Sequence, residues 1–384
     1  MSMGLIGRNL PRIKEVNQFL IRENIYRNGP VSRNDVANSL GLTLPTITTN
    51  ISNMLGSGIL REIPVVQEQK TLGRHTMLVD FIPQSRLFLG VEIRDGICRV
   101  VLTDLRGNIV GSFVDDRTVS EYEDIINRSV RLSEDLLASC EVPVEKLSAV
   151  GFCVPAFRWD ERKSARDFAV KMGYRGDVYT RTTAVARAYG LSLFDPDKVK
   201  DVPSFAYFFV NSFIACSIIT EAGPHFGKVA GEGEIGHNIF NPDGPACEHG
   251  FKGCLEYYSG ELSILSKAEK ALVQKKSRVL EGLLRANGKL TMDLVLQAEQ
   301  SGDSAVCEII DEAVKYLGIA VHNISNVIRP GCFVIESKLF ANEENREKLK
   351  KYGGTENLVF LDFDDTGGAR GAAAVAVKGF LENV

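Results

Sequence analysis

The segments Gly233-Glu-Ile-Gly-His237 and Cys247-Glu-His-Gly-Phe-Lys-Gly-Cys254 gather histidine and cysteine side chains within a short length of chain. The candidate metal ligands among them are His237, Cys247, His249 and Cys254. Two imidazoles and two thiols form a closed tetrahedral ligand set for zinc, which leaves no open position for a reactive water. Gly250 and Gly253 let the backbone fold back between the last two ligands. The segment therefore predicts a structural Zn2+ site, and the alternative is a metal-free loop with two thiols and a surface histidine.

Short apolar runs and helical patterns alternate on both sides of this segment. Before it, runs at 87–93, 98–103 and 109–114 predict an antiparallel strand meander. A buried strand at 149–154 and a second strand pair within 204–219 indicate that the arrangement is repeated. Helices are predicted over 122–139, 304–327 and 365–382. A strand meander, a helix and a strand form half of a ribonuclease-H-like lobe, so we expect an α/β fold with two lobes.

The whole chain resembles the ROK family, named for its repressors, open reading frames and kinases. The family's signature is G-E-x-G-H followed by C-x-C-G-x-x-G-C-x-E, and the chain departs from it at His249, which replaces a second cysteine. Histidine also binds zinc well, so we expect metal binding to survive with altered affinity. The resemblance implies a sugar-kinase fold of the actin and hexokinase type over residues 84–384. Its first lobe would span about 84–200 plus the C-terminal helix, and its second lobe about 201–365.

The resemblance also implies the position of a sugar site. Glu234, His237 and Glu256 would face the sugar, because the carboxylates accept hydrogen bonds from vicinal hydroxyls and the zinc-bound histidine contacts the ring. The family's catalytic aspartate aligns with Arg181, which stays protonated and cannot be a general base. Arg181 would either pair with a nearby carboxylate or bind an anionic effector such as a sugar phosphate or sugar acid.

The two phosphate-binding loops of the family are replaced as well. The first becomes Glu92–Cys98, which lacks the glycine pair whose backbone amides cradle phosphate, and the second becomes Asn211–Cys216. Phosphoryl transfer depends on such positioning, so we expect no catalytic residues and no enzyme activity. The stretch from Pro155 to Tyr179 is also shorter than is usual in the family, which weakens the prediction of an intact sugar pocket.

Residues 1–83 differ from the rest of the chain in charge and in pattern. The net charge of −4 divides into +3 for residues 1–81 and −7 for the remainder. Three helices are predicted over 13–26, 32–41 and 43–56, followed by two strands over 59–65 and 76–81. Ser32 and Thr43 are suited to cap the second and third helices. This order of elements is that of a winged helix-turn-helix, which the family's repressor branch carries and its kinase branch lacks.

The third predicted helix has a short, polar and uncharged outer face. Asparagine can pair bidentately with adenine and threonine offers a hydroxyl or a methyl group, so this face suits base edges in the major groove. A basic wing would reach the DNA backbone or the minor groove. The candidate DNA-binding residues are Ser32, Arg33, Thr46, Thr48, Thr49, Asn50, Asn53, Lys70 and Arg74. The alternative for this domain is a small helical interaction module.

We therefore expect a sequence-specific DNA-binding regulator of carbohydrate metabolism, of the repressor type, whose kinase-like domain is a sensor. Its expected partners are double-stranded operator DNA, a sugar or sugar-derived effector, and further copies of itself in a dimer or a dimer of dimers. The apolar runs are shorter than the ~20 residues of a membrane span and no secretory signal is visible, so we expect a cytoplasmic location without membrane contact. The alternatives are an ATP-dependent sugar kinase with atypical loops and a constitutive regulator with a decayed sugar pocket.

Overall fold

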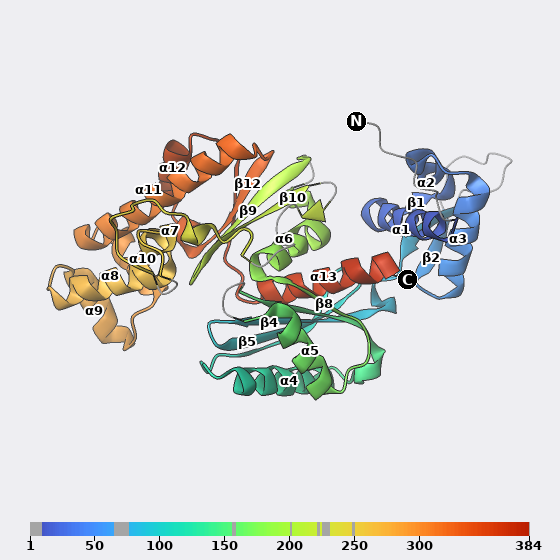
Figure 1. The fold of residues 1–384 in the computed structure, drawn as a ribbon, viewed down its shortest axis with the longest axis horizontal. Coiled ribbons are helices and arrows are strands. Elements are labelled where there is room, and N and C mark those ends of the chain that lie inside the picture. Colours follow the sequence, from blue (N-terminus) through green and yellow to red (C-terminus); the bar gives the residue numbers. More distant parts are fainter. Residues whose placement is uncertain are drawn as a thin grey trace. The chain divides into compact units, whose positions relative to one another are not determined.

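The computed structural model describes residues 10–64, 77–155, 159–199, 202–220, 223–224, 231–247 and 250–383 (Figure 1). Contacts divide the chain into two compact units. Unit 1 comprises Met1–Phe152, Arg162–Thr180 and Ala372–Val384, and unit 2 comprises Cys153–Glu161 and Arg181–Gly371.

The N-terminal domain, which belongs to unit 1, contains three helices and a small sheet. Its elements are α1 (Leu10–Asn28), β1 (Val31–Ser32), α2 (Arg33–Leu40), α3 (Leu44–Gly56), β2 (Leu60–Pro64) and β3 (Met77–Phe81). Ser32 caps α2 by accepting a hydrogen bond from the amide of Asp35, as predicted. Apolar side chains such as Ile21 and Ile51 are fully buried between the helices. The predicted order of helices and hairpin strands is confirmed, and β1 adds a strand to give the sheet order β1-β3-β2.

The rest of unit 1 is built on a five-stranded sheet in the order β6-β5-β4-β7-β8. Its strands are β4 (Leu87–Arg94), β5 (Ile97–Asp104), β6 (Ile109–Asp115), β7 (Leu147–Val154) and β8 (Val178–Thr182). Figure 1 shows α4 (Tyr122–Ser139) and α5 (Glu161–Met172) on one face of this sheet and α13 (Gly367–Asn383) on the other. A Cβ added to Gly151 of β7 would come within 1.7 Å of the carbonyl oxygen of Ala372 in α13, so this close packing requires glycine.

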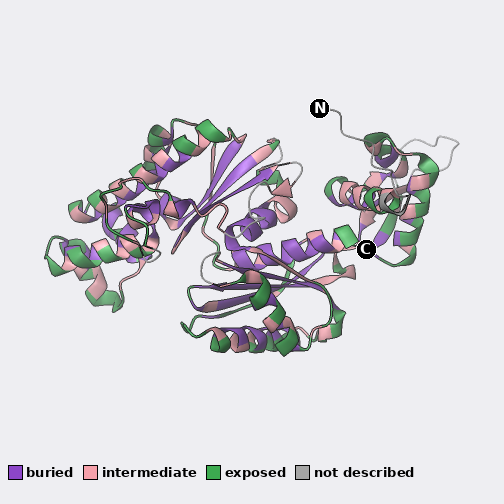
Figure 2. Cartoon of the chain, in the orientation of Figure 1, coloured by how far each residue is buried: buried purple, intermediate pink, exposed green. Residues whose placement is uncertain are grey.

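Unit 2 contains a second five-stranded sheet, in the order β11-β10-β9-β12-β13. Its strands are β9 (Ser204–Val210), β10 (Ile214–Thr220), β11 (Gly223–Pro224), β12 (Cys332–Glu336) and β13 (Leu358–Leu361). Its helices are α6 (Thr183–Phe194), α7 (Leu255–Ser259), α8 (Glu261–Val273), α9 (Arg278–Asn287), α10 (Met292–Gln300), α11 (Ser304–Val327) and α12 (Glu343–Gly353). Figure 2 shows that the strands of this sheet are mostly buried.

The side chains of β9 alternate between two apolar cores, as the period of a strand requires. Ala206 and Phe208 pack with residues of α8, α10 and α11 on one face of the sheet. Phe205 and Phe209 pack with residues of α6 on the other face. The sheet of unit 2 is therefore covered by helices on both sides.

The lobe boundary differs from the expected one. The sequence placed residues 84–200 in the first lobe, whereas α6 belongs to unit 2. The physical reason is that Ala184 and Leu191 of α6 pack into the core beneath β9. In the ranges that the structure covers, no helix is both long enough and apolar enough to cross a bilayer.

Candidate functional site

Residues 233–256, of which 233–247 and 250–256 are described, lead into the start of α7 and fold tightly; we call this segment the knuckle. Its short helix η4 (Ile235–His237) is followed by a loop in which the amide of Cys247 donates to the carbonyl of Phe251 at 2.7 Å. A Cβ on Gly253 would meet the carbonyl oxygen of Asn241 at 1.6 Å, and its φ of +60° lies in the left-handed region. Glycine at this position therefore permits the turn that brings Cys254 back towards η4.

The knuckle brings three of the four predicted metal ligands together. The ligand atoms of His237, Cys247 and Cys254 all lie within 4.8 Å of one another, and Cys247 Sγ lies 4.0 Å from His237 Nδ1. Ligands of one zinc ion, at about 2.0–2.3 Å from the metal, stand about 3.5 Å apart, so modest closure would fit the ion. Burial raises the pKa of the Cys254 thiol. The predicted fourth ligand, His249, lies outside the described residues.

Glu256, predicted to bind a sugar, is held against the knuckle. Its Oε2 accepts a hydrogen bond from the amide of Ile214 at 3.2 Å, and a Cβ added to Gly236 would lie 2.6 Å from that oxygen. The amide of His237 donates to the carbonyl of Glu234 at 3.1 Å. Glu234, His237 and Glu256 are thus tied to one short stretch of unit 2, whereas Arg181 is half-buried in β8, where unit 1 passes into unit 2.

The turn that replaces the first phosphate loop is filled by buried charged side chains. Glu92, Arg94 and Arg99 are all less than 5% exposed. Arg94 Nε lies 3.3 Å from Glu92 Oε1, and Arg99 Nε lies 4.0 Å from Glu92 Oε2. These pairs neutralise charge in the hairpin of β4 and β5, where the family's loop presents backbone amides to phosphate.

The turn that replaces the second phosphate loop is tied to the start of α8. Asn211 Nδ2 donates to Glu261 Oε2 at 2.7 Å, and the amide of Glu261 donates to the carbonyl of Asn211 at 2.8 Å. The Phe213 ring of the same turn packs on Phe209, with 5.1 Å between ring centres. Side chains therefore occupy both of the turns that replace the family's phosphate-binding loops.

A buried polar network at the end of β12 was missed by the sequence analysis. Arg187 Nη1 donates to Glu336 Oε1 at 2.6 Å, and both side chains are less than 5% exposed. The Tyr207 hydroxyl also donates to Glu336, and burial raises the pKa of this tyrosine. The network borders a cavity of about 180 Å³ in unit 2. Two features of the sequence could have indicated this network: an arginine within the alanine-rich α6 and a glutamate at the end of an apolar strand.

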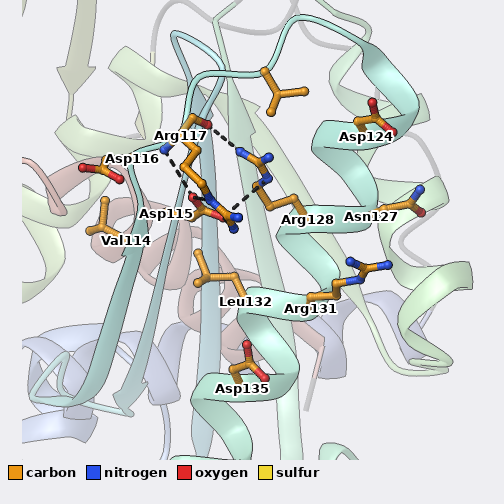
Figure 3. A pocket seen from close by; sticks show the side chains of 11 residues that line it. Val114, Asp115, Asp116, Arg117, Asp124, Asn127, Arg128, Arg131, Leu132 and Asp135 are labelled. Atoms are coloured by element: carbon orange, nitrogen blue, oxygen red, sulfur yellow. Dashed lines mark hydrogen bonds and ion pairs between the residues drawn. The ribbon is translucent and has the colours of Figure 1, made fainter.

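A second cavity, of about 570 Å³, lies between β6 and α4 in unit 1 (Figure 3). Two arginines hold Asp115 in the wall of this cavity. Arg117 Nε donates to Asp115 Oδ1 at 2.8 Å, and Arg128 Nε lies 3.4 Å from Asp115 Oδ2. The hydrogen bonds from Arg117 hold the pKa of Asp115 below its usual value, against the effect of burial. None of the predicted site residues lines this cavity.

Helix α3 presents the predicted polar face. Thr48, Thr49 and Asn53 are exposed, whereas Thr46 and Asn50 are half-buried. Asn50 Nδ2 donates to the carbonyl of Thr46, one turn earlier, at 2.8 Å. This bond uses one of the two N–H groups of the Asn50 amide, and it competes with other partners for that group.

The other candidate DNA-binding residues have different surroundings. The Ser32 hydroxyl donates to Asp35 Oδ2 at 2.7 Å while it caps α2. Arg33 Nη2 pairs with Glu62 Oε1 of β2 at 2.7 Å. Lys70 and Arg74 of the predicted wing lie outside the described residues.

The chain matches the model of a known protein family, and it is similar to known proteins in sequence and in fold. The model of the ROK family matches residues 89–378. The xylose repressor of Bacillus subtilis is 23% identical to this chain, and the match covers 97% of each protein.

Two of the solved structures that match this chain illustrate the shared fold. One is a ROK family transcriptional regulator, a homolog of the E. coli Mlc protein, with a TM-score of 0.78, 17% identity and coverage of 96% of this chain and 97% of that chain. The other is a ROK family glucokinase from Streptomyces griseus, in complex with glucose and AMPPNP, with a TM-score of 0.64, 18% identity and coverage of 76% of this chain and 99% of that chain. The predicted two-lobed fold is confirmed by these likenesses.

Proposed function

Since the chain belongs to the ROK family, we propose that it is a DNA-binding transcriptional repressor of carbohydrate metabolism whose kinase-like domain senses a sugar or sugar derivative. The observation that carries this proposal is the N-terminal domain of three helices and a small sheet, which precedes the family domain. The xylose repressor matches nearly the whole chain, whereas the glucokinase matches only part of it. A DNA-binding domain joined to a sugar-binding fold suits a regulator better than an enzyme.

In this proposal α3 enters the major groove as the recognition helix of a winged helix-turn-helix. Its outer face offers Thr48 and Asn53 directly, whereas Thr49 and Asn50 each donate one hydrogen bond to a carbonyl one turn earlier. Lys70 and Arg74 would contact the DNA backbone or minor groove. Two copies would bind the half-sites of a pseudo-palindromic operator. Selection from a pool of random duplexes tests the function: enrichment of such a sequence is expected, and recovery of no preferred sequence would contradict it.

Asn50→Ala is expected to weaken operator binding mainly at one base pair. Loss of a bidentate amide contact costs about 1–3 kcal/mol, or roughly 5- to 150-fold in affinity. Fluorescence anisotropy with the selected operator and its single-base variants measures this effect. Equal loss on every sequence would show that Asn50 does not read a base.

Asn287→Ala provides a matched control for this substitution. Asn287 Nδ2 donates to the carbonyl of Leu283 at 2.8 Å, one turn earlier in α9, as Asn50 does in α3. The control removes the same local bond far from α3 in sequence and should leave operator affinity unchanged.

The sensor would bind its effector beside Glu234, His237 and Glu256. The filled phosphate turns support sensing without phosphoryl transfer, because side chains stand where a kinase of this fold needs free amides. Incubation with ATP and a panel of sugars separates the two functions: sugar-dependent ATP consumption would establish a kinase, while stabilisation by a sugar without ATP consumption supports the sensor. A regulator with a decayed sugar pocket would show neither ATP consumption nor stabilisation by a sugar.

Arg181→Ala is expected to abolish stabilisation by anionic effectors. A ligand at a hundred times its Kd stabilises by about 2.7 kcal/mol, which raises Tm by about 5–10 °C for a unit of this size. Thermal unfolding with each sugar, its phosphate and its acid measures the effect. Arg175→Ala, an exposed arginine just before β8, is the control. Equal stabilisation of wild type and Arg181→Ala would assign Arg181 to a structural ion pair.

The proposal includes a structural zinc ion in the knuckle and a homodimer as the minimal assembly. His237, Cys247 and Cys254 are close enough to share an ion, and His249 would complete a closed set. When bound, zinc would hold the loop that carries the sugar-binding residues. Operator binding would place the protein in the cytoplasm, where bacterial repressors meet DNA.

A further inference from the structure

One face of α1 contacts the end of the last helix. The residues of this face are Phe19, Arg22, Glu23 and Tyr26, which recur at the spacing of one side of a helix. Arg22 is 5% exposed, and its Nε donates to the carbonyl of Leu381 at 2.7 Å and its Nη2 to that of Glu382 at 3.1 Å. The last carbonyls of a helix have no partner within it and carry partial negative charge. Arg22 therefore caps the C-terminal end of α13 with a buried positive charge.

Further polar contacts extend this α1–α13 contact along unit 1. Lys378 Nζ of α13 lies 2.9 Å from Glu23 Oε1 and 4.5 Å from the centre of the Phe19 ring. The Tyr26 hydroxyl donates to the carbonyl of Leu105, after β5, at 2.8 Å. These contacts hold α1 against α13 and against the residue that follows β5.

Helix α13 begins in unit 2, where its first turn is held by α6. Arg370 pairs with Asp195 Oδ2 at 2.5 Å and lies over the Phe194 ring, 5.2 Å from its centre. From Ala372 onwards the helix belongs to unit 1, where its backbone lies directly against Gly151 of β7. The C-terminal part of α13 therefore lies with its backbone against the sheet of unit 1 and with its last carbonyls against α1 of the N-terminal domain.

We propose that the C-terminal end of α13 sets the placement of the N-terminal domain within unit 1, and that Arg22 and Lys378 are the positioning residues. The proposal rests on the proposed function and specifies how the DNA-binding domain is held. In a dimer, this placement determines which half-site spacing binds best.

Two independent substitutions test the proposal in the full-length protein. Arg22→Met keeps the unbranched side chain but removes the charge and the donors, and Lys378→Met removes the ion pair with Glu23. Each should weaken binding to the complete selected operator by about tenfold, because two loosely held domains lose effective concentration on paired half-sites. Binding to a single half-site should change by less than about twofold. Arg22→Lys, which keeps a charge and donors, should recover part of the lost affinity.

Lys350→Met is the matched control, because Lys350 pairs with Glu347 at 2.5 Å within α12, which belongs to unit 2. Unchanged affinity for the complete operator in both test variants would overturn the proposal. Equal loss on the complete operator and the half-site would overturn it too, since that result shows damage to the domain itself.

Hydrogen exchange separates failure of this proposal from failure of the proposed function. If the wild-type protein selects no duplex, the proposed function fails. The α1–α13 contact can then still be tested by the rate of hydrogen exchange at the backbone amides of residues 10–28. Faster exchange there in Arg22→Met than in Lys350→Met would support positioning of the domain by α13. Equal exchange in the two variants would overturn it.

Discussion

Cys254→Ser is expected to abolish zinc binding and to lower the stability of unit 2. A serine hydroxyl is a poor substitute for a thiolate ligand, and the remaining ligands cannot close a tetrahedral set. Structural zinc contributes about 10–16 kcal/mol of binding free energy in zinc-finger peptides, where metal and folding are fully coupled. Unit 2 has a large apolar core of its own, so we expect a smaller loss of about 3 kcal/mol, or about 6–12 °C in Tm.

Metal analysis and chelator titration measure this result. Wild-type protein should contain one zinc per chain and should lose Tm when a strong chelator is added, whereas Cys254→Ser should contain none and should not respond. Cys307→Ser, which changes a half-buried thiol of α11 outside the knuckle, should keep both the zinc and the chelator response. Zinc-free wild-type protein with an unchanged Tm under chelation would exclude a structural metal.

Glu336→Leu is expected to destabilise unit 2 by about 3–5 kcal/mol, because it leaves the Arg187 charge buried without its carboxylate. The substitution also removes the acceptor for the Tyr207 hydroxyl and for the amide of Asp364, which lies 3.1 Å from Glu336 Oε1. Chemical denaturation followed by circular dichroism measures the change.

The double variant Arg187→Met with Glu336→Leu separates charge from packing. Replacing both partners with apolar side chains removes the unpaired charge, so at least half of the lost stability should return. A single variant as stable as wild type would show that the network contributes nothing to stability. If the double variant is no more stable than Glu336→Leu alone, the loss of stability comes from packing and not from the unpaired charge.

The sequence predicted long amphipathic helices better than short elements. The bounds of α4 and α11 agree with the predicted 122–139 and 304–327, because many apolar residues recur at the helical period in both. Helix α5 was missed, since its buried Ala165, Phe168 and Met172 are few among charged residues. The short strands β12 and β13 were also missed, because an apolar run of four or five residues does not distinguish a strand from a buried helix turn.

The residues of the candidate site also differ in how well the sequence could predict them. The knuckle was predictable because its ligands lie close together in the sequence and their chemistry restricts what they can bind. Arg187 and Glu336 are 149 positions apart, and Arg22 and Leu381 are 359 apart, so only the fold shows that they are partners. Neither arginine carries a local signal that names its partner.

The buried charges in the hairpin of β4 and β5 also restrict how this chain can evolve. Exchange of Arg94 alone for a glycine would remove the nearer of two guanidinium groups beside the buried Glu92, since Arg94 Nε lies 3.3 Å and Arg99 Nε 4.0 Å from its carboxylate oxygens. Exchange of Glu92 alone would leave two buried guanidinium groups. Each single step towards a phosphate loop therefore passes through a protein less stable than its parent, and several substitutions must arrive together. The buried pairs therefore make it unfavourable to build a phosphate loop at this hairpin by single substitutions.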